Sequence, residues 1–377
     1  SIRRQRQMCI RDRQMKIIRK IILVVICVIL VDYIYQYNQF QKYNQAPLII
    51  KTPEGSNQPY HPSVIYIPEG WNGYKYWMAE TPYPLGEDGD WKGLPPYRER
   101  WENPCVHVSK DGIHWNDFED SQNPIDDLDE NNIINKDYFS DPHLVFYKDT
   151  LECWYRISHQ KNNATYILRK YTLNGKDWSP REVMINLQDT SIIKNETGNM
   201  VISPAIHKGT NGYVMWYVNS IEKPREICRS FSTDGKKWSK KETCHLPDNS
   251  VTPWHIDLAY IDKIYYLVIY DYDTNNLVLY SSSDGLSFNN KKYILSKAPM
   301  LGSFYSYGLY RSSLIKDNEK YKLYFSAFEK KTAIGLMEGN SISTLHATSA
   351  EGNFISFCKF PIVYLRNKKQ SLKELFQ

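Results

Sequence analysis

Three acidic residues have the surroundings that general acid–base chemistry needs. Asp141 opens an apolar run in "SDPHLVFY", and Asp257 stands in "WHIDLAYID". Glu102 lies in "RWENPCVHVS", where a long polar stretch returns to strand-like sequence. One carboxyl group can protonate a leaving group while a second activates water or attacks the substrate. We therefore predict Glu102 as the acid/base, Asp141 as its partner, and Asp257 as a third carboxylate or an orienting group. The alternative is that Glu102 merely caps a turn and that Asp141 initiates one.

Histidines lie close to two of these carboxylates. His143 follows Asp141 by two positions and His255 precedes Asp257 by two, so each pair shares one face of a strand. His61 opens a further strand-like run, "HPSVIYI". An imidazole in such a place can act as an acid, bind a substrate or orient a carboxylate. We predict substrate-binding roles for His61, His143 and His255, against the alternative that each is a satisfied polar residue of a strand.

Arginine and aromatic side chains supply candidate binding groups. Arg156 in "CWYRIS" and Arg311 in "LYRSS" can form bidentate hydrogen bonds to hydroxyl groups or to an anionic substituent. Their alternative role is a salt bridge between neighbouring units. Trp254, Tyr83 and Tyr307 are predicted platforms for a ring-shaped ligand. His207 lies beside a predicted loop and is a weaker candidate.

A seven-residue phrase recurs and indicates how these residues are positioned. It occurs as "SKDGIHW", "TLNGKDW", "STDGKKW" and "SSDGLSF", with its glycines at Gly112, Gly175, Gly235 and Gly285. Asp-Gly and Asn-Gly provide turn residues that tolerate positive φ, and a preceding Ser or Thr hydroxyl can cap the turn. The phrase therefore predicts an outer hairpin turn, and its aspartates are not expected to do chemistry.

Each phrase follows a pair of strand-like runs, which makes a unit of about four short strands. The pairs are 61–67 with 74–80, 140–147 with 151–158, 203–209 with 213–219, 254–262 with 264–271, and 309–316 with 321–328. A degenerate phrase, "TSAEGNF", follows the fifth pair. Five such units predict an all-β, five-bladed β-propeller, preceded by one N-terminal hydrophobic helix. A β-sandwich is the alternative, but it does not require a repeated unit.

The opening "SDPH", the "WYR" of the next strand and the recurring S-x-D-G-x-x-W turn resemble those of the five-bladed propeller glycosidases grouped around glycoside hydrolase families 43, 32, 68 and 117. The resemblance covers about residues 55–365. It implies a central channel lined by the first strand of each unit, with a substrate pocket at one mouth. Similar enzymes carry Asp, Asp and Glu at the first three openings, whereas this chain has His61, Asp141 and Ser203.

The resemblance implies hydrolysis of a glycosidic bond in an oligo- or polysaccharide. Two alternatives stay open because of His61 and Ser203: a non-catalytic glycan-binding propeller, including an accessory of surface polysaccharide assembly, and a glycan-transferring or phosphorolytic enzyme. We expect a carbohydrate substrate, a monomer, no nucleic-acid partner and no cofactor or metal ligands, with a structural calcium ion left open.

The N-terminal residues carry most of the positive charge. Residues 1–20 hold eight basic residues and one acidic residue, so the remaining chain is close to neutral and has no basic surface for nucleic acid. The apolar run 21–31 follows Lys16, Arg19 and Lys20, as in an uncleaved signal anchor or a cleaved signal peptide. This predicts a single-pass membrane protein with an extracytoplasmic propeller, or a secreted one.

We divide the chain into a leader of upstream translation (1–14), the signal anchor or signal peptide (15–36), a linker (37–54), the propeller (55–365) and a C-terminal tail (366–377). The five cysteines after residue 27 lack zinc-site spacing, and a bridge between Cys228 and Cys244 is less expected than two reduced core cysteines. The acidic stretch 117–132 lacks the spacing of a calcium loop. Asn163 and Asn195 begin glycosylation sequons.

Overall fold

The computed structural model describes residues 2–43, 46–84, 102–129, 131, 137–159, 164–186, 201–220, 224–247, 251–298, 303–318, 320–329, 331–347 and 353–375 of the 377 in the chain. Asn163 and Asn195, and the degenerate turn glycine Gly352, lie outside the described residues. The chain forms two compact units, residues 45–350 and residues 1–44 together with 351–377. All predicted site residues belong to the first unit.

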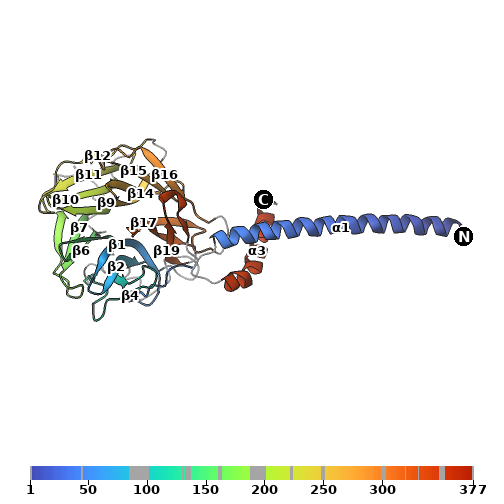
Figure 1. Cartoon of the computed structure of the whole chain (residues 1–377), viewed down its shortest axis with the longest axis horizontal. Coiled ribbons are helices and arrows are strands. Elements are labelled where there is room, and N and C mark those ends of the chain that lie inside the picture. Colours follow the sequence, from blue (N-terminus) through green and yellow to red (C-terminus); the bar gives the residue numbers. More distant parts are fainter. Residues whose placement is uncertain are drawn as a thin grey trace. The chain divides into compact units, whose positions relative to one another are not determined.

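The larger unit consists of five antiparallel sheets of four strands each. Figure 1 shows them arranged around a common centre. The blades are β1 (Pro59–Trp71), β2 (Tyr74–Pro82), β3 (Cys105–Ser109), β4 (Asn116–Asp117); β5 (Tyr138–Tyr147), β6 (Thr150–His159), β7 (Ala164–Thr172), β8 (Glu182–Asn186); β9 (Val201–Gly209), β10 (Gly212–Asn219), β11 (Glu226–Ser232), β12 (Glu242–Thr243); β13 (Pro253–Ile261), β14 (Ile264–Asp271), β15 (Asn276–Ser282), β16 (Asn290–Leu295); and β17 (Gly308–Asp317), β18 (Lys320–Phe328), β19 (Thr332–Gly339), β20 (His346–Ala347). The predicted five-bladed β-propeller is confirmed.

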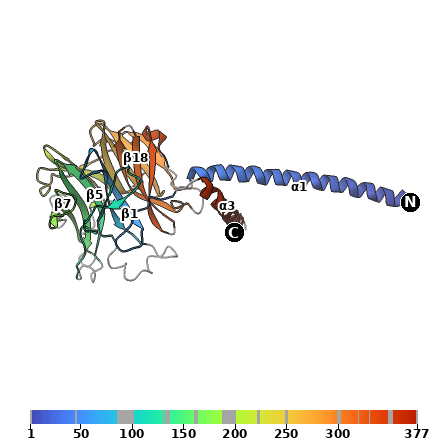
Figure 2. The ribbon, with the colours of Figure 1, turned by 60° about the horizontal axis from the view of Figure 1, so that its bottom comes forward.

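The first strand of each blade lines the centre of the ring. These strands contact one another in the order β1, β5, β9, β13, β17 and back to β1, which closes the ring. Figure 2 shows β1 and β5 beside one another. Large side chains of the second strands, including Trp77, Trp154 and Trp216, are fully buried in the cores that join the blades. The inner strands are therefore held from behind by packed blades, which fixes the positions of the side chains that point into the channel.

The repeated phrase forms the turn between the third and fourth strands of the first four blades. In the first blade Ser109 Oγ accepts the Gly112 N–H at 2.9 Å, and Asp111 Oδ1 accepts the N–H groups of Ile113 and His114, both at 2.8 Å. The same bonds recur around Asp234 and Asp284. The prediction of an outer hairpin turn is confirmed, and the carboxylates of these aspartates accept backbone N–H groups of the turn.

The turn glycines also pack onto the preceding blade. A Cβ on Gly175 would lie 2.5 Å from the ring of Trp77, and a Cβ on Gly285 would lie 2.9 Å from the ring of Trp216. Gly235 lies in the same way against Trp154, and Gly112 against Tyr324 of the last blade. All four glycines have positive φ. Only glycine combines this backbone conformation with so close an approach, which explains why the phrase repeats.

The second unit contains two helices, α1 (Ile2–Tyr43) and α3 (Asn353–Leu375). Phe360 of α3 packs against Tyr33, Tyr37 and Phe40 of α1, and Lys368 pairs with Asp32 at 2.9 Å. Helix α1 runs through the segments predicted as leader, anchor and part of the linker. Helix α3 was not predicted from the sequence. Among the described residues, neither helix has the length and apolar character needed to cross a membrane.

Candidate active site

The inner strands carry an irregularity at the level where the predicted site residues lie. Each of β1, β5 and β9 pairs with the second strand of its own blade, and the register shifts at His61, Asp141 and Ser203, respectively. These three residues have φ values of 52°, 54° and 54°. A β-bulge re-aims a side chain and interrupts the ladder. Non-glycine residues in this region carry strain of about 1–3 kcal/mol each. The bulges therefore turn these residues out of the ladder, at a cost that is typical of functional sites.

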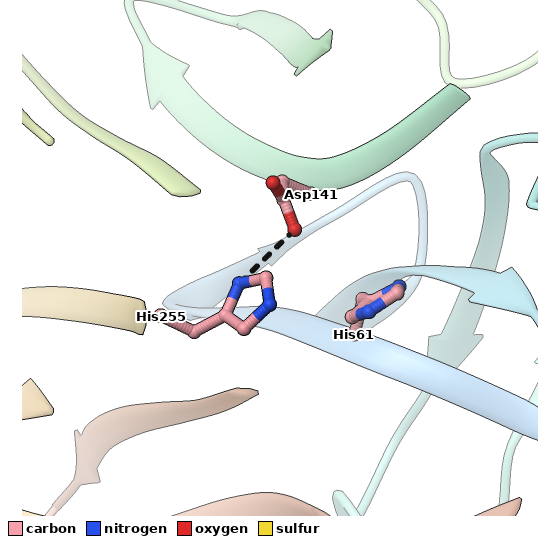
Figure 3. A group of neighbouring side chains, drawn as sticks. All are labelled: His61, Asp141 and His255. Carbon is pink, nitrogen blue, oxygen red and sulfur yellow. Dashed lines mark ion pairs between the residues drawn. The ribbon is translucent and has the colours of Figure 1, made fainter. Parts of the chain in front are cut away.

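His61, Asp141 and His255 converge from three different blades. Figure 3 shows the three side chains pointing toward one another from β1, β5 and β13. Ligand atoms of all three lie within 4.8 Å of one another, and each residue is at most 2% exposed. His255 Nδ1 is 3.2 Å from Asp141 Oδ1, although neither atom makes a hydrogen bond of good geometry. An imidazole nitrogen and a carboxylate oxygen this close together are atoms of types that can bind one metal ion.

One carboxylate oxygen of Asp141 is held by neighbouring groups, and the other faces His255. Its Oδ2 accepts the Ser203 N–H at 3.1 Å and lies 3.2 Å from Arg156 Nε. Arg156 is fixed in turn by Ser140 Oγ, at 3.0 and 2.7 Å from Nε and Nη2. Burial alone would raise the pKa of Asp141, but His255 and Arg156 hold it well below its usual range. Asp141 is therefore an oriented carboxylate with Oδ1 directed at His255.

The two histidines are buried and oriented by their neighbours. His61 Nδ1 lies 2.7 Å from the Thr81 hydroxyl oxygen, and this contact leaves Nε2 on the opposite edge of the ring. The His255 ring packs on Tyr310 with 4.3 Å between ring centres. Burial lowers the pKa of both histidines below the ordinary value, well below it for His61. A neutral imidazole nitrogen is the form that binds a metal ion.

The donor set of these three residues fits a divalent cation. Catalytic zinc sites use three ligands drawn from imidazole and carboxylate groups and leave a further position open. Bonds of about 2.0–2.2 Å at tetrahedral angles place neighbouring ligand atoms about 3.3–3.6 Å apart, and the distance of 3.2 Å between His255 Nδ1 and Asp141 Oδ1 is close to that range. A hydroxyl partner on the second nitrogen of His61 is the kind of support that metal-binding histidines have.

Glu102 lies beside this cluster. Its Oε1 is 3.7 Å from His61 Nδ1, the residue is 4% exposed, and its backbone has a φ of 60°. Burial raises the pKa of Glu102 well above its usual range, which outweighs the opposite influence of Arg156. The structure thus places the predicted acid/base next to its predicted partner, with pKa values moved in opposite directions. Such a separation is typical of carboxyl groups with different catalytic roles.

Aromatic rings surround the histidines. Tyr60 stacks on Tyr310 with 5.0 Å between ring centres, and Tyr83 lies 5.9 Å from His61. Trp254 Nε1 donates to the Tyr310 hydroxyl at 3.0 Å. The guanidinium carbon of Arg225 lies 4.3 Å from the ring centre of Trp254, so Trp254 is not an open platform. Tyr307 is 67% exposed and packs against Phe328.

Other predicted residues lie at a different level of the channel. Asp257 Oδ1 is 3.7 Å from His143 Nδ1, and both residues line a cavity of about 490 Å³ between the inner strands. Asp257 Oδ2 accepts the Leu314 N–H at 3.0 Å, and burial raises its pKa. Arg311 is 1% exposed and donates to the Pro142 carbonyl. The structure therefore groups Asp257 with His143 instead of with Glu102. His207 also lines this cavity.

Sequence patterns identified His61, Asp141 and His255 individually but did not indicate that the three form one set of possible metal ligands. They also missed Thr81 and Tyr310, which support the two histidines. The available signal was that His61, Asp141 and His255 all open inner strands, because equivalent positions in a propeller meet at one mouth of the channel. Cys228 and Cys244, the pair for which a bridge was considered, are both buried and are not joined by a disulfide bond.

Comparisons with known proteins agree with this architecture. No family model matches the chain. A curated relative, the A type blood N-acetyl-alpha-D-galactosamine deacetylase of Flavonifractor plautii, is 23% identical over 336 residues, which cover 73% of this chain and 41% of that protein. The chain thus spans less than half the length of this relative.

Solved structures share the fold. A crystal structure of an N-acetylgalactosamine deacetylase from F. plautii in complex with blood group B trisaccharide superposes with a TM-score of 0.63 at 20% identity, over 78% of this chain and 95% of that one. The GH43_1 enzyme from Xanthomonas citri complexed with xylotriose gives a TM-score of 0.53 at 11% identity, over 84% and 97%. The propeller is therefore the one found in glycoside hydrolase family 43, as the resemblance implied.

Proposed function

We propose that the protein is a metal-dependent carbohydrate deacetylase, which hydrolyses the amide of an N-acetylated sugar. The observation that carries the proposal is the buried cluster of His61, Asp141 and His255 with Glu102 beside it. The named activity of the F. plautii relative supports the same reaction. Two histidines and one aspartate are unusual for cleaving a glycosidic bond, which uses two carboxylic acids, but they suit hydrolysis of an amide with a cation.

In this proposal His61, Asp141 and His255 hold a divalent cation such as zinc. A bound cation of this kind lowers the pKa of a water molecule and polarises a carbonyl oxygen. The Ser203 N–H and Arg156 fix the rotamer of Asp141, and Thr81 fixes the ring of His61. These supporting contacts keep the ligands in one arrangement, which matters because a displacement of about 1 Å costs about 100-fold in rate.

Glu102 moves the proton. In the reaction the C–N bond of the acetamide breaks, the oxygen of a water adds to the acyl carbon, and acetate and a free amine are formed. Glu102 accepts a proton from the water and returns it to the leaving nitrogen. The raised pKa of Glu102 suits proton transfer, because a buried carboxyl group whose pKa is raised accepts a proton more readily than an ordinary carboxylate and can then donate it.

Hydrolysis of a glycosidic bond is the second candidate. The observation in its favour is that the carboxyl groups of Glu102 and Asp141 share one site while the pKa of the first is raised and that of the second is lowered. His61 and Ser203 stand where the resembling glycosidases carry their other carboxylates, so we rank this reaction below deacetylation.

One experiment separates these functions. The full chain is incubated with a glycan library, with added Zn²⁺, Mn²⁺ or Co²⁺ or with a chelator, while released acetate and new reducing ends are measured. Deacetylation predicts acetate that depends on the metal and is lost in His255→Ala, with His207→Ala as a matched control from the neighbouring strand. New reducing ends without metal dependence would favour the glycosidase, and glycan binding without either product would favour a binding protein.

We also propose an extracytoplasmic location, either anchored by the N-terminal segment or secreted. Its support is the apolar run 21–31 after Lys16, Arg19 and Lys20. Fractionation of cells that express the full chain, with protease added to intact cells, tests this location. A protein that stays in the cytosol and is protected from protease would refute it.

A further inference from the structure

Arg225 contacts two aromatic rings near the candidate active site. Its guanidinium carbon is 4.3 Å from the ring centre of Trp254 and 4.9 Å from that of Tyr272. Trp254 directly precedes His255, and their ring centres are 6.1 Å apart. The guanidinium is therefore no more than about 10 Å from a candidate metal ligand. A neighbouring part of a glycan bound at the candidate site can span this distance.

Arg225 differs from the other arginines that lie over aromatic rings. Each of the other four has a carboxylate partner in the described part of the chain: Arg156 with Asp141, Arg169 with Glu182, Arg181 with Asp126, and Arg229 with Glu242. Across the residues that the structure describes, no carboxylate pairs with Arg225, and its Nη1 is buried without a hydrogen-bond partner. A buried, unpaired N–H of a charged group is costly, so its persistence points to a partner that binds there.

The carboxylates nearest in sequence are already engaged. Asp271 accepts the Thr252 N–H at 2.9 Å and the Thr274 hydroxyl, and Asp273 accepts the Thr252 hydroxyl. Glu226 pairs with Lys241 at 3.1 Å. None of these acids pairs with the guanidinium, which contacts the rings of Trp254 and Tyr272 and has its Nη1 buried without a partner. An arginine without a carboxylate partner can recognise a carboxylate, sulfate or phosphate group with two parallel hydrogen bonds.

We propose that Arg225 binds an anionic substituent of the glycan, on a sugar next to the one that is deacetylated. The natural substrate is then an acidic glycan that carries N-acetylated sugars. This inference rests on the proposed deacetylase function and adds a substrate class to it. Contacts with two rings restrict the Arg225 side chain, so less side-chain entropy is lost when the anion binds.

The test uses the full-length protein and matched pairs of N-acetylated oligosaccharides. The pairs are a hyaluronan tetrasaccharide and its carboxyl-reduced form, a chondroitin tetrasaccharide with and without a sulfate group, and a phosphorylated and a plain chitotetraose. Acetate release gives kcat and KM, and a glycan array gives relative binding. The proteins are the wild type, Arg225→Gln, Arg225→Lys and the control Arg229→Gln, whose arginine also covers a ring but has its own carboxylate.

The wild type is expected to prefer the anionic member of at least one pair, and the preferred pair identifies the anion. Arg225→Gln should raise KM for that member at least about tenfold, to the value of the neutral member, with kcat unchanged. Arg225→Lys should keep part of the preference, and Arg229→Gln all of it. A merely structural Arg225 would lower stability without changing the preference between the two members.

Equal treatment of both members of every pair by the wild type, or a preference that survives in Arg225→Gln, would overturn the inference while leaving deacetylation intact. If the metal-loaded wild type releases acetate from no oligosaccharide and binds none, the proposed function fails and this inference fails with it. The two failures are therefore distinguishable.

Discussion

Replacing Glu102 by glutamine should separate the catalytic role of this residue from its effect on folding. Glutamine keeps the size and shape of the side chain but cannot carry a proton between water and the leaving nitrogen. General acid–base groups contribute about 10²–10⁴-fold to a rate. We therefore expect kcat for acetate release to fall by that factor in Glu102→Gln, while metal content and KM stay close to those of the wild type.

The folding stability of Glu102→Gln should increase relative to the wild type as the pH rises, although its activity falls. Burial raises the pKa of Glu102, so above the ordinary value of 4.5 the unfolded chain releases a proton that the folded chain retains. Wild-type stability from this group is fully present below pH 4.5 and is lost as the pH rises toward the raised pKa, by up to about 1.4 kcal/mol per pH unit. Glutamine does not titrate, so in the metal-free protein the variant should gain on the wild type as the pH rises.

Both effects are measurable in one preparation, by metal-dependent acetate release and by urea unfolding of the chelated protein between pH 4 and pH 8. Glu80→Gln is the matched control, since Glu80 is also a buried glutamate with a raised pKa but bonds to His107 at 3.1 Å. That change should leave acetate release unaffected and destabilise the fold, because His107 loses a partner of its charge. Glu102→Gln with near wild-type kcat would refute the role of Glu102.

Further predictions concern the support of the site and the packing of the blades. Thr81→Val removes the partner of His61 Nδ1 and should weaken metal binding about 10–100-fold, measured by competition with a chromogenic chelator. Burial lowers the pKa of His143 to about 3, so this histidine contributes folding stability above the ordinary pKa of 6.5 and that contribution is lost as the pH falls. The free energy of unfolding should decrease by roughly 1.5–2 kcal/mol between pH 6.5 and pH 5. This decrease should be absent in His143→Asn. A Cβ at Gly235 would lie 2.7 Å from Met184, whereas a Cβ at Gly73, where φ is also positive, would have nothing within 4 Å. Gly235→Ala should therefore reduce the free energy of unfolding by about 1–3 kcal/mol more than Gly73→Ala. Equal losses in urea unfolding would contradict the packing role.

The sequence was sufficient to predict the blades because each carries its own local signals. Alternating apolar residues mark the strands, and the recurring Asp-Gly or Asn-Gly turn marks their count and register. The same signals placed His61, Asp141 and His255 at strand openings, where the structure has them. Helix α3 has no comparable marker, since it contains Pro361 and follows a degenerate turn.

The grouping of the site residues could not be predicted in the same way. Asp257 was placed with Glu102 because it shares a strand face with His255, yet two residues along a strand advance about 6.6 Å. That distance moves Asp257 to another level of the channel, where it meets His143. The metal-binding arrangement depends on bulges in separate blades and on distances between residues far apart in sequence, which alternation within one strand does not report.

The contacts of the turn glycines also join neighbouring blades. They join the fifth blade to the first, the first to the second, the second to the third and the third to the fourth. Among the described glycines none makes this contact between the fourth and fifth blades, and β14 has Leu267 and Val268 near the level where β6 and β10 have tryptophan. Ala at one of these turn glycines should therefore speed hydrogen exchange first along the junction that its own contact joins. Each repeated turn thus both closes the outer edge of one blade and contacts a neighbouring blade.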